Sequence, residues 1–159
     1  MTISYDRIKA VAYAREWAFG RNPAYYNFDR IGGDCTNFVS QCIFAGAGVM
    51  NFTPVTGWFY LSVNDRTASW TGVEYLYRFL TQNEGAGPFG SDADLSLAET
   101  GDVIQLGRET GDFYHTAIIT GFTGGTPLVA AHTFNAYDKP LRDYAFERAR
   151  LVHIEGVRK

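Results

Sequence analysis

Cys35 is the residue best placed to do chemistry in this sequence. It follows Gly32, Gly33 and Asp34, a context that permits a tight turn and predicts a helix that begins at the sulfur. A thiol reacts as its thiolate, and the partial positive charge of a helix N-terminus lowers the thiol pKa. We therefore predict that Cys35 is an activated nucleophile. Cys42, two turns further along the same helix, is predicted to be a small core residue.

The spacing of the two cysteines argues against a disulfide and against a zinc site. On one helix, a separation of seven residues places the sulfurs about 10 Å apart along the axis. Cα atoms more than about 7 Å apart cannot be bridged. The chain also lacks Cys-x-x-Cys and His-x-x-x-His pairs, the spacings typical of zinc ligands. We expect no metal and no cofactor.

A histidine is needed to accept the thiol proton and to pass a proton to the leaving group. His115 is expected near the start of one strand and His132 near the end of the next. A hairpin about residues 123–126 would bring both to the same end of a sheet. We predict that His115 is the base and that His132 orients it as the third member of a triad. Asn135 and Asp138 are the alternatives for that third place.

The composition is that of one folded domain, spanning residues 1–159. Lys and Arg number 14 against 17 Asp and Glu, a net charge of −3 without any block of like charges. This balance argues against a nucleic-acid partner. No stretch approaches the roughly 18 apolar residues of a membrane span, and we expect a monomer. The N-terminus lacks the layout of a signal peptide. The compartment therefore stays open: the cell wall or the exterior for a piece of an exported protein, the cytoplasm otherwise.

Hydrophobic periodicity predicts a helix over residues 5–19, a helix from residue 35 to Gly46 or Gly48, and a third helix that starts at a capping box over 71–74 and ends at Gly85. It predicts strands over 102–106, 114–122, 128–133 and 150–154. In the first helix, Ile8, Val11, Ala12 and Arg15 share one face. Residues 50–70 show no sustained period, and a Gly-rich linker is expected over 85–94. Helices followed by strands indicate an α+β fold, with the Cys35 helix packed on a C-terminal antiparallel sheet.

Aromatic residues make up 16% of the chain, and several fall in the irregular stretch before residue 71. Aromatic side chains line sites for flat ligands and sugar faces, and they also fill cores. We predict that Trp58, Phe59, Tyr60 and Trp70 line a substrate groove, with core packing as the alternative.

Three segments together resemble the bacterial amidase domain of the papain-like superfamily, a relative of the NlpC-type and CHAP cell-wall hydrolases. They are residues 32–41 (GGDCTNFVSQ), 101–106 (GDVIQL) and 114–116 (YHT). The resemblance implies a papain-like fold, Cys35 as nucleophile, His115 as base and a polar third residue that matches His132. It also implies that a tyrosine upstream of the cysteine, Tyr25 or Tyr26, helps to form the oxyanion hole.

These observations indicate a cysteine amidase or peptidase. Its substrate is expected to be peptidoglycan, cut at an amide bond through a thioester intermediate. The first alternative is a cysteine amidase acting on another peptide or on a small-molecule amide. The second, from a different class, is a binding module without activity. The candidate residues for the oxyanion hole and for substrate binding are Tyr25, Tyr26, Asp34, Trp58 and Trp70.

Overall fold

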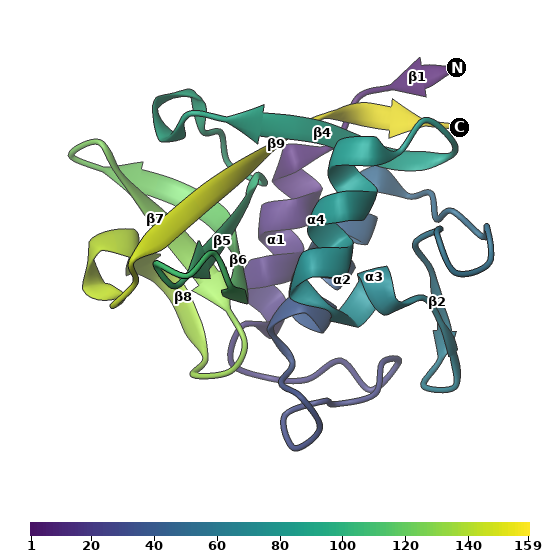
Figure 1. The fold of residues 1–159 in the computed structure, drawn as a ribbon, viewed down its shortest axis with the longest axis horizontal. Coiled ribbons are helices and arrows are strands. Elements are labelled where there is room, and N and C mark those ends of the chain that lie inside the picture. The colour runs from purple at the N-terminus through teal and green to yellow at the C-terminus, as the bar shows by residue number, and fades with distance from the viewer.

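The helices come from the first half of the chain and most strands from the second, in a computed structural model that describes residues 1–159 (Figure 1). The helices are α1 (Arg7–Trp17), α2 (Cys35–Ala47), α3 (Ala68–Thr71) and α4 (Val73–Gln82). The strands are β1 (Thr2–Ile3), β2 (Tyr60–Ser62), β3 (Asp65–Arg66), β4 (Gly87–Ala93), β5 (Val103–Gly107), β6 (Phe113–Thr123), β7 (Thr126–Ala131), β8 (Ala136–Pro140) and β9 (Arg148–Arg158). Short 3-10 turns occupy Leu95–Leu97 and Leu141–Asp143. The expected α+β class is confirmed.

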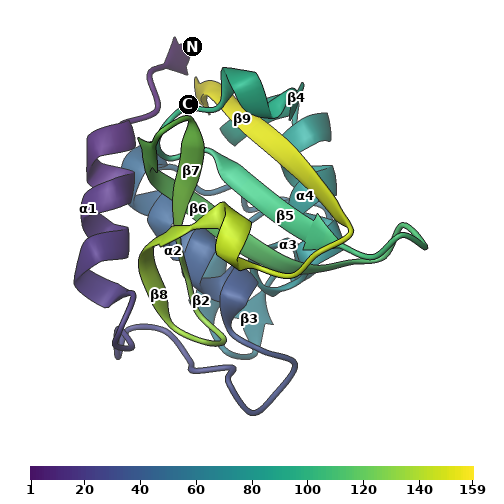
Figure 2. The same cartoon turned by 90° about the vertical axis from the view of Figure 1, so that its left-hand side faces the viewer.

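Seven strands form one antiparallel sheet in the order β1-β9-β5-β6-β7-β8, with β4 paired to β9 beside this path. β2 and β3 form a separate two-stranded ribbon. The sheet is curled, and Figure 2 shows β6 and β7 in front of α2, with α1 along one edge. The two chain ends lie side by side because β1 pairs with the end of β9.

Helix α2 is the central element of the fold. Every residue from Cys35 to Ile43 is buried, and the helix carries no charged side chain. Such a helix is stable only when other elements surround it. Gly46 lets the end of α2 approach the residue before α1 closely, since a Cβ at position 46 would lie 2.6 Å from the carbonyl oxygen of Asp6. The start of α1 is thereby held against the end of α2.

The buried face of α1 differs from the one expected. Ala10, Ala14 and Ala18 are fully buried, whereas 84% of Ile8 is exposed to solvent. Alanines four residues apart form a smooth stripe that lets two helices approach closely. The prediction that the larger apolar residues of α1 form its buried face was wrong, because the space beside α2 admits only small side chains.

The two faces of the curled sheet support two hydrophobic clusters, since successive side chains of a strand point to opposite faces. The helix-facing cluster includes Val103, Ile118 and Ala130, together with Phe38 of α2. The second cluster lies on the other face and includes Ile104, Ala117, Ile119, Val129 and Leu151.

Trp58 and Trp70 belong to the helix-facing cluster, and neither is exposed at all. The indole N–H of Trp58 donates to the Ser40 hydroxyl, and that of Trp70 donates to the side-chain oxygen of Asn37. The expectation that these tryptophans line a substrate groove is therefore wrong. Their polar atoms are satisfied by α2, which makes them core residues.

The predicted strands are present as β5, β6, β7 and β9, but β4 was expected to be a linker. Gly90 explains the difference, because a Cβ at this position would lie 2.2 Å from the carbonyl oxygen of His153. The glycines of this segment permit close pairing with β9 rather than a flexible connection. No helix of the structure is long and apolar enough to cross a lipid bilayer.

Candidate active site

Cys35 is the first residue of α2, as the sequence predicted. Gly32 and Gly33 precede it with φ angles of +80° and +95°, a left-handed conformation that glycine adopts without a steric penalty. This turn places the sulfur at the helix N-terminus, where Cys35 keeps 8% of its surface exposed. Cys42 lies two turns deeper and has no exposed surface.

Cys35 and His115 line the same cavity, which has a volume of about 210 Å³. Its other walls are Gly32, Gly33, Leu106, Tyr114, Thr133, Phe134, Tyr144 and Ala145. α2 supplies the sulfur and β6 supplies the imidazole, so residues 80 positions apart in the chain line one cavity. The structure thus brings the predicted nucleophile and the predicted base together.

The protonation of this pair differs from the expectation of an activated thiolate. Burial raises the pKa of Cys35, and hydrogen bonds from the backbone of Thr116 and from Thr36 offset this only in part. Burial also lowers the pKa of His115 to about 4, with a smaller contribution from the positive charge of Lys139. Near neutral pH the resting pair is therefore a thiol beside a neutral imidazole. Desolvation outweighs the helix N-terminus because both side chains are largely buried in the cavity wall.

The backbone N–H groups at the start of α2 are not capped by a side chain. Asp34 occupies the N-cap position, but its carboxylate accepts hydrogen bonds from the Phe28 N–H and the Asn37 side-chain amide instead. The first turn of a helix has four N–H groups without intrahelical partners. The Asp34 N–H donates to the Thr133 hydroxyl, but no side chain caps the N–H groups from Cys35 onward, and these can stabilise a negative charge next to the sulfur.

His132 does not contact His115, contrary to the predicted triad. Its Nδ1 lies 2.5 Å from Oδ2 of Asp34, and its Nε2 lies 2.8 Å from the carbonyl oxygen of Trp17. The hairpin itself is as expected, with Ile118 paired to Ala130. However, His115 lies on the same face of β6 as Ala117 and Ile119, which points away from α2. His132 instead stacks on Phe38 of α2, with ring centroids 4.0 Å apart.

His132 and Asp34 form a buried hydrogen-bonded pair, and both ring nitrogens of His132 face oxygen atoms. Burial favours the neutral form of Asp34, but hydrogen bonds from His132, Asn37 and the Phe28 N–H outweigh it and lower the pKa. The carboxylate is consequently charged, and Nε of Arg21 lies 3.6 Å from its Oδ2.

The two alternatives for the third residue also have other partners. Asn135 accepts a hydrogen bond from Arg21 at 2.9 Å, and Asp138 accepts one from the Thr120 hydroxyl at 2.7 Å. Neither residue lines the cavity that holds His115.

Tyr25 and Tyr26 lie outside that cavity as well. The Tyr25 ring stacks on Trp70 at 6.0 Å between centroids. The backbone N–H of Tyr26 donates to the Tyr60 hydroxyl. Both residues support the loop that leads to α2, and neither has its hydroxyl near the sulfur cavity.

Three residues of the cavity wall were not anticipated. Thr133 and Phe134 follow β7 with φ angles of +58° and +65°, and strained backbone of this kind collects at functional sites. Phe134 is 91% exposed at the rim. Tyr144 follows the Leu141–Asp143 turn, and its position depends on long-range packing that no local pattern reveals.

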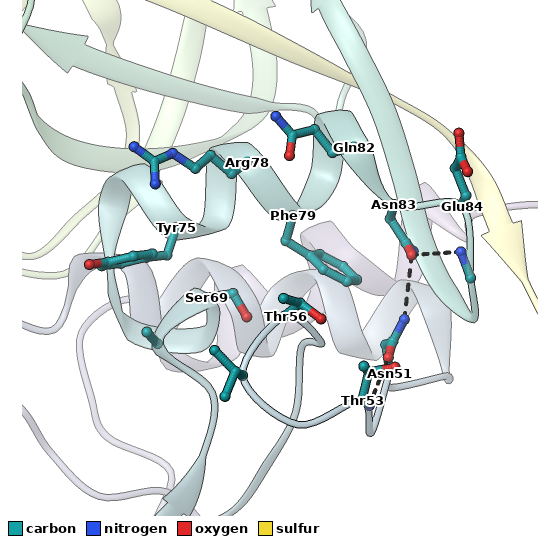
Figure 3. Close-up of a pocket in the computed structure, with 13 residues that line it drawn as sticks. Asn51, Thr53, Thr56, Ser69, Tyr75, Arg78, Phe79, Gln82, Asn83 and Glu84 are labelled. Carbon is teal, nitrogen blue, oxygen red and sulfur yellow. Dashed lines mark hydrogen bonds between the residues drawn. The ribbon is translucent and has the colours of Figure 1, made fainter.

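A second and larger hollow of about 520 Å³ lies between α4 and the segment before β2 (Figure 3). Phe79 of α4 points into it, with Thr56 and Ser69 opposite. The Ser69 hydroxyl donates to the Gly57 carbonyl and is paired with Thr67. The lining contains no cysteine or histidine. Nucleophilic chemistry is therefore better supported in the cavity of Cys35.

Comparison with known proteins identifies the family. Residues 4–154 match the model of the family described as "Putative amidase domain". The chain belongs to this amidase family. It is also similar to "Uncharacterized protein YhbB" of Bacillus subtilis (strain 168), with 35% identity over 147 residues. That match covers 90% of this chain but 45% of the relative, so the chain spans less than half of the relative's length. No solved structure matches the chain. Membership of the amidase family suggests hydrolase activity on amide bonds.

Proposed function

We propose that the protein is a cysteine-dependent amidase of the papain-like superfamily, related to the NlpC-type and CHAP hydrolases. The observation that supports this most is the cavity that Cys35 and His115 share. The thiol lies there at the N-terminus of α2, and β6 supplies the imidazole. Membership of the amidase family supplies the reaction class. The α+β fold, with a nucleophile helix packed on an antiparallel sheet, agrees with a papain-like architecture.

In the first half of the reaction, Sγ of Cys35 attacks the carbonyl carbon of an amide while its proton passes to His115. The negative charge that forms on the carbonyl oxygen is stabilised by the free backbone N–H groups of the first turn of α2. One such donor contributes about 3 kcal/mol to transition-state stabilisation. The C–N bond then breaks, His115 returns the proton to the departing amine, and a thioester remains on Cys35.

In the second half, water replaces the amine. His115 removes a proton from the water molecule as its oxygen attacks the thioester carbonyl carbon. The C–S bond breaks, the carboxylic acid leaves, and the proton returns from His115 to the sulfur. No ion pair has to exist before the substrate arrives, because general base catalysis moves the proton during the attack. The neutral resting pair agrees with this route.

We propose peptide amide bonds of peptidoglycan as the substrate. The resemblance to cell-wall hydrolases supports this class, and the rim of the cavity is suited to it. Phe134 and Tyr114 are exposed there, and aromatic faces pack well on sugars and on peptide backbone. A peptide or small-molecule amide from another source remains the alternative substrate, and the experiment below separates the two.

The test is digestion of purified peptidoglycan, with the released fragments identified by mass spectrometry. Wild-type protein and Cys42→Ala are expected to release the same fragments, whereas Cys35→Ala releases none. The new amine and carboxyl ends would name the bond that is cut. Full activity of Cys35→Ala would overturn the cysteine mechanism. Cleavage of model peptide amides without cleavage of peptidoglycan would overturn the substrate assignment and leave the mechanism intact.

A further inference from the structure

Two polar atoms beside the proposed nucleophile are buried and have no hydrogen-bond partner: Nε2 of His115 and the hydroxyl of Tyr144. Buried polar atoms without partners are rare in folded proteins, and each one calls for a specific explanation. Here both residues line the cavity that contains Cys35. A bond between them would satisfy both atoms at once.

Tyr144 is held next to His115 by its surroundings. The two ring centroids are 5.8 Å apart and the ring planes are tilted by 33°, so the rings are direct neighbours. The segment that follows is tethered at two points, since the Tyr114 hydroxyl donates to the Ala145 carbonyl and the Glu147 N–H donates to the Gly107 carbonyl. These bonds attach it to β6 and to the end of β5.

A cation lies over the Tyr144 ring. Nζ of Lys139 lies 4.0 Å from the ring centroid, a favourable arrangement for an aromatic face. The Tyr144 ring thus has a lysine of β8 and the histidine of β6 as neighbours. Burial raises the pKa of its hydroxyl, so Tyr144 is a neutral phenol near neutral pH.

No other polar side chain is available to orient His115. His132 is bound to Asp34, Asn135 to Arg21, and Asp138 to Thr120, as described above. Besides His115 and Tyr144, the cavity is lined by three residues with polar side chains, Cys35, Tyr114 and Thr133. Its remaining wall residues are glycine or apolar. Of the three polar residues, the Tyr114 hydroxyl is bonded to Ala145 and the Thr133 hydroxyl accepts from the Asp34 N–H.

We propose that Tyr144 is the positioning residue for His115. The structure itself does not contain this bond, but a small rotation of either side chain would let Nε2–H of His115 donate a hydrogen bond to the phenol oxygen and so fix the ring and its tautomer. Nδ1 then keeps its lone pair free to accept the proton of Cys35. The catalytic part of this inference rests on the proposed function, but the hydrogen bond and the tautomer do not.

A phenol in this place has a different effect from the carboxylate or amide of other triads. A carboxylate would stabilise the imidazolium and raise its pKa, whereas a neutral phenol orients the ring without adding a negative charge. Lys139 acts in the opposite direction and disfavours a second positive charge nearby. The arrangement maintains His115 as a neutral base, which is the state that the proposed proton transfer needs.

The first test is nuclear magnetic resonance of ¹⁵N-histidine-labelled protein at pH 7. The two ring nitrogens of a neutral imidazole have different shifts, so the spectrum reports which one carries the hydrogen. We expect His115 to be the Nε2–H tautomer in wild-type protein and a mixture of tautomers in Tyr144→Phe. An Nδ1–H tautomer in wild-type protein, or an unchanged spectrum in Tyr144→Phe, would overturn the inference.

The second test is kinetic. Tyr144→Phe removes one oxygen atom and should lower kcat about tenfold with KM unchanged, the order of effect of one lost hydrogen bond. Tyr75→Phe is the matched control, since this exposed tyrosine of α4 lies in the other hollow. An unchanged kcat in Tyr144→Phe contradicts the positioning role. Absence of turnover in the wild type would contradict the proposed function instead, and the tautomer measurement would still decide the hydrogen bond.

Discussion

His132 and Asp34 form a buried pair directly before the proposed nucleophile, with Nδ1 of His132 2.5 Å from Oδ2 of Asp34. The pair joins the end of β7 to the start of α2. Because the Asp34 carboxylate is engaged there, it does not cap the helix, and the N–H groups beside Cys35 stay free. His132, which was expected in the catalytic triad, instead binds the residue that precedes Cys35 and so holds the start of α2 in place.

Replacement of His132 by Gln should destabilise the fold strongly. Losing a buried hydrogen bond to a charged group costs about 1.5–3 kcal/mol, because the Asp34 carboxylate then keeps the Arg21 guanidinium, 3.6 Å away, but not its closest partner. Urea denaturation followed by circular dichroism measures this loss. Asn135→Ala, a nearby exposed position, is the control and should change the free energy of unfolding by less than about 0.5 kcal/mol. A His132→Gln variant as stable as the wild type would disprove the structural role of the pair.

Stability should fall as the pH is lowered from about 6.5 to 4, and His115 should be a main cause. Its pKa is lowered from 6.5 to about 4 in the folded protein, so the unfolded chain binds the proton first in this window. The contribution is complete above pH 6.5 and is lost as the pH falls through 4, and it amounts to about 3 kcal/mol. The lowered pKa of Asp34 acts only below its ordinary value of 3.8.

The variant His115→Phe removes this titration while filling the same space. Chemical denaturation at several pH values should give a flatter dependence of the free energy of unfolding between pH 6.5 and 4 than in the wild type. Equal slopes in the two proteins would show that His115 is protonated in the folded state as readily as in the unfolded chain.

Alkylation of Cys35 should be slow near pH 6 and should accelerate as the pH approaches and exceeds 9, the ordinary thiol value. Its pKa is raised by burial, so the reactive thiolate is scarce at neutral pH. Iodoacetamide labelling followed by peptide mass spectrometry measures the rate at each cysteine. Cys42, which is fully buried, should react only after unfolding. Rapid selective labelling of Cys35 at pH 6 would instead indicate a preformed thiolate–imidazolium pair.

Substitutions of aromatic residues should separate the core from the rim. Trp70→Ala removes a fully buried side chain and should cost about 3–5 kcal/mol of stability. Phe134→Ala removes an exposed one and should leave the melting temperature unchanged while raising KM for the substrate. Thermal denaturation and steady-state kinetics on both variants test this. A Phe134→Ala variant with unchanged KM would exclude this residue from substrate contact.

The sequence predicted the helix that carries Cys35 and the β6–β7 hairpin because their signals are local. Gly32 and Gly33 mark the turn, and the strands carry β-branched and apolar runs on both sides of a Gly-Gly turn. The same reasoning failed for β4, whose glycines permit pairing with β9. It also failed for α1, where the decisive quantity is the distance to α2 rather than the hydrophobicity of the side chains.

The sequence predicted Cys35 and His115 as partners, and the structure has both in the wall of one cavity. The prediction of His132 as the third residue was wrong. Hairpin register shows which residues lie at the same end of a sheet, and His132 does lie there. It does not show which face each ring takes when the strand ends at Ala131 and the chain turns. Tyr144 carried no recognisable signal, because its place beside His115 depends on tethers to β5 and β6.

The central claim is a covalent thioester on Cys35, and the most direct measurement is mass spectrometry of the protein quenched in acid during turnover. We expect an acyl adduct on the peptide that contains Cys35, and no adduct in Cys35→Ala. Substrate cleavage that continues in Cys35→Ala, or an adduct on any other residue, would contradict it.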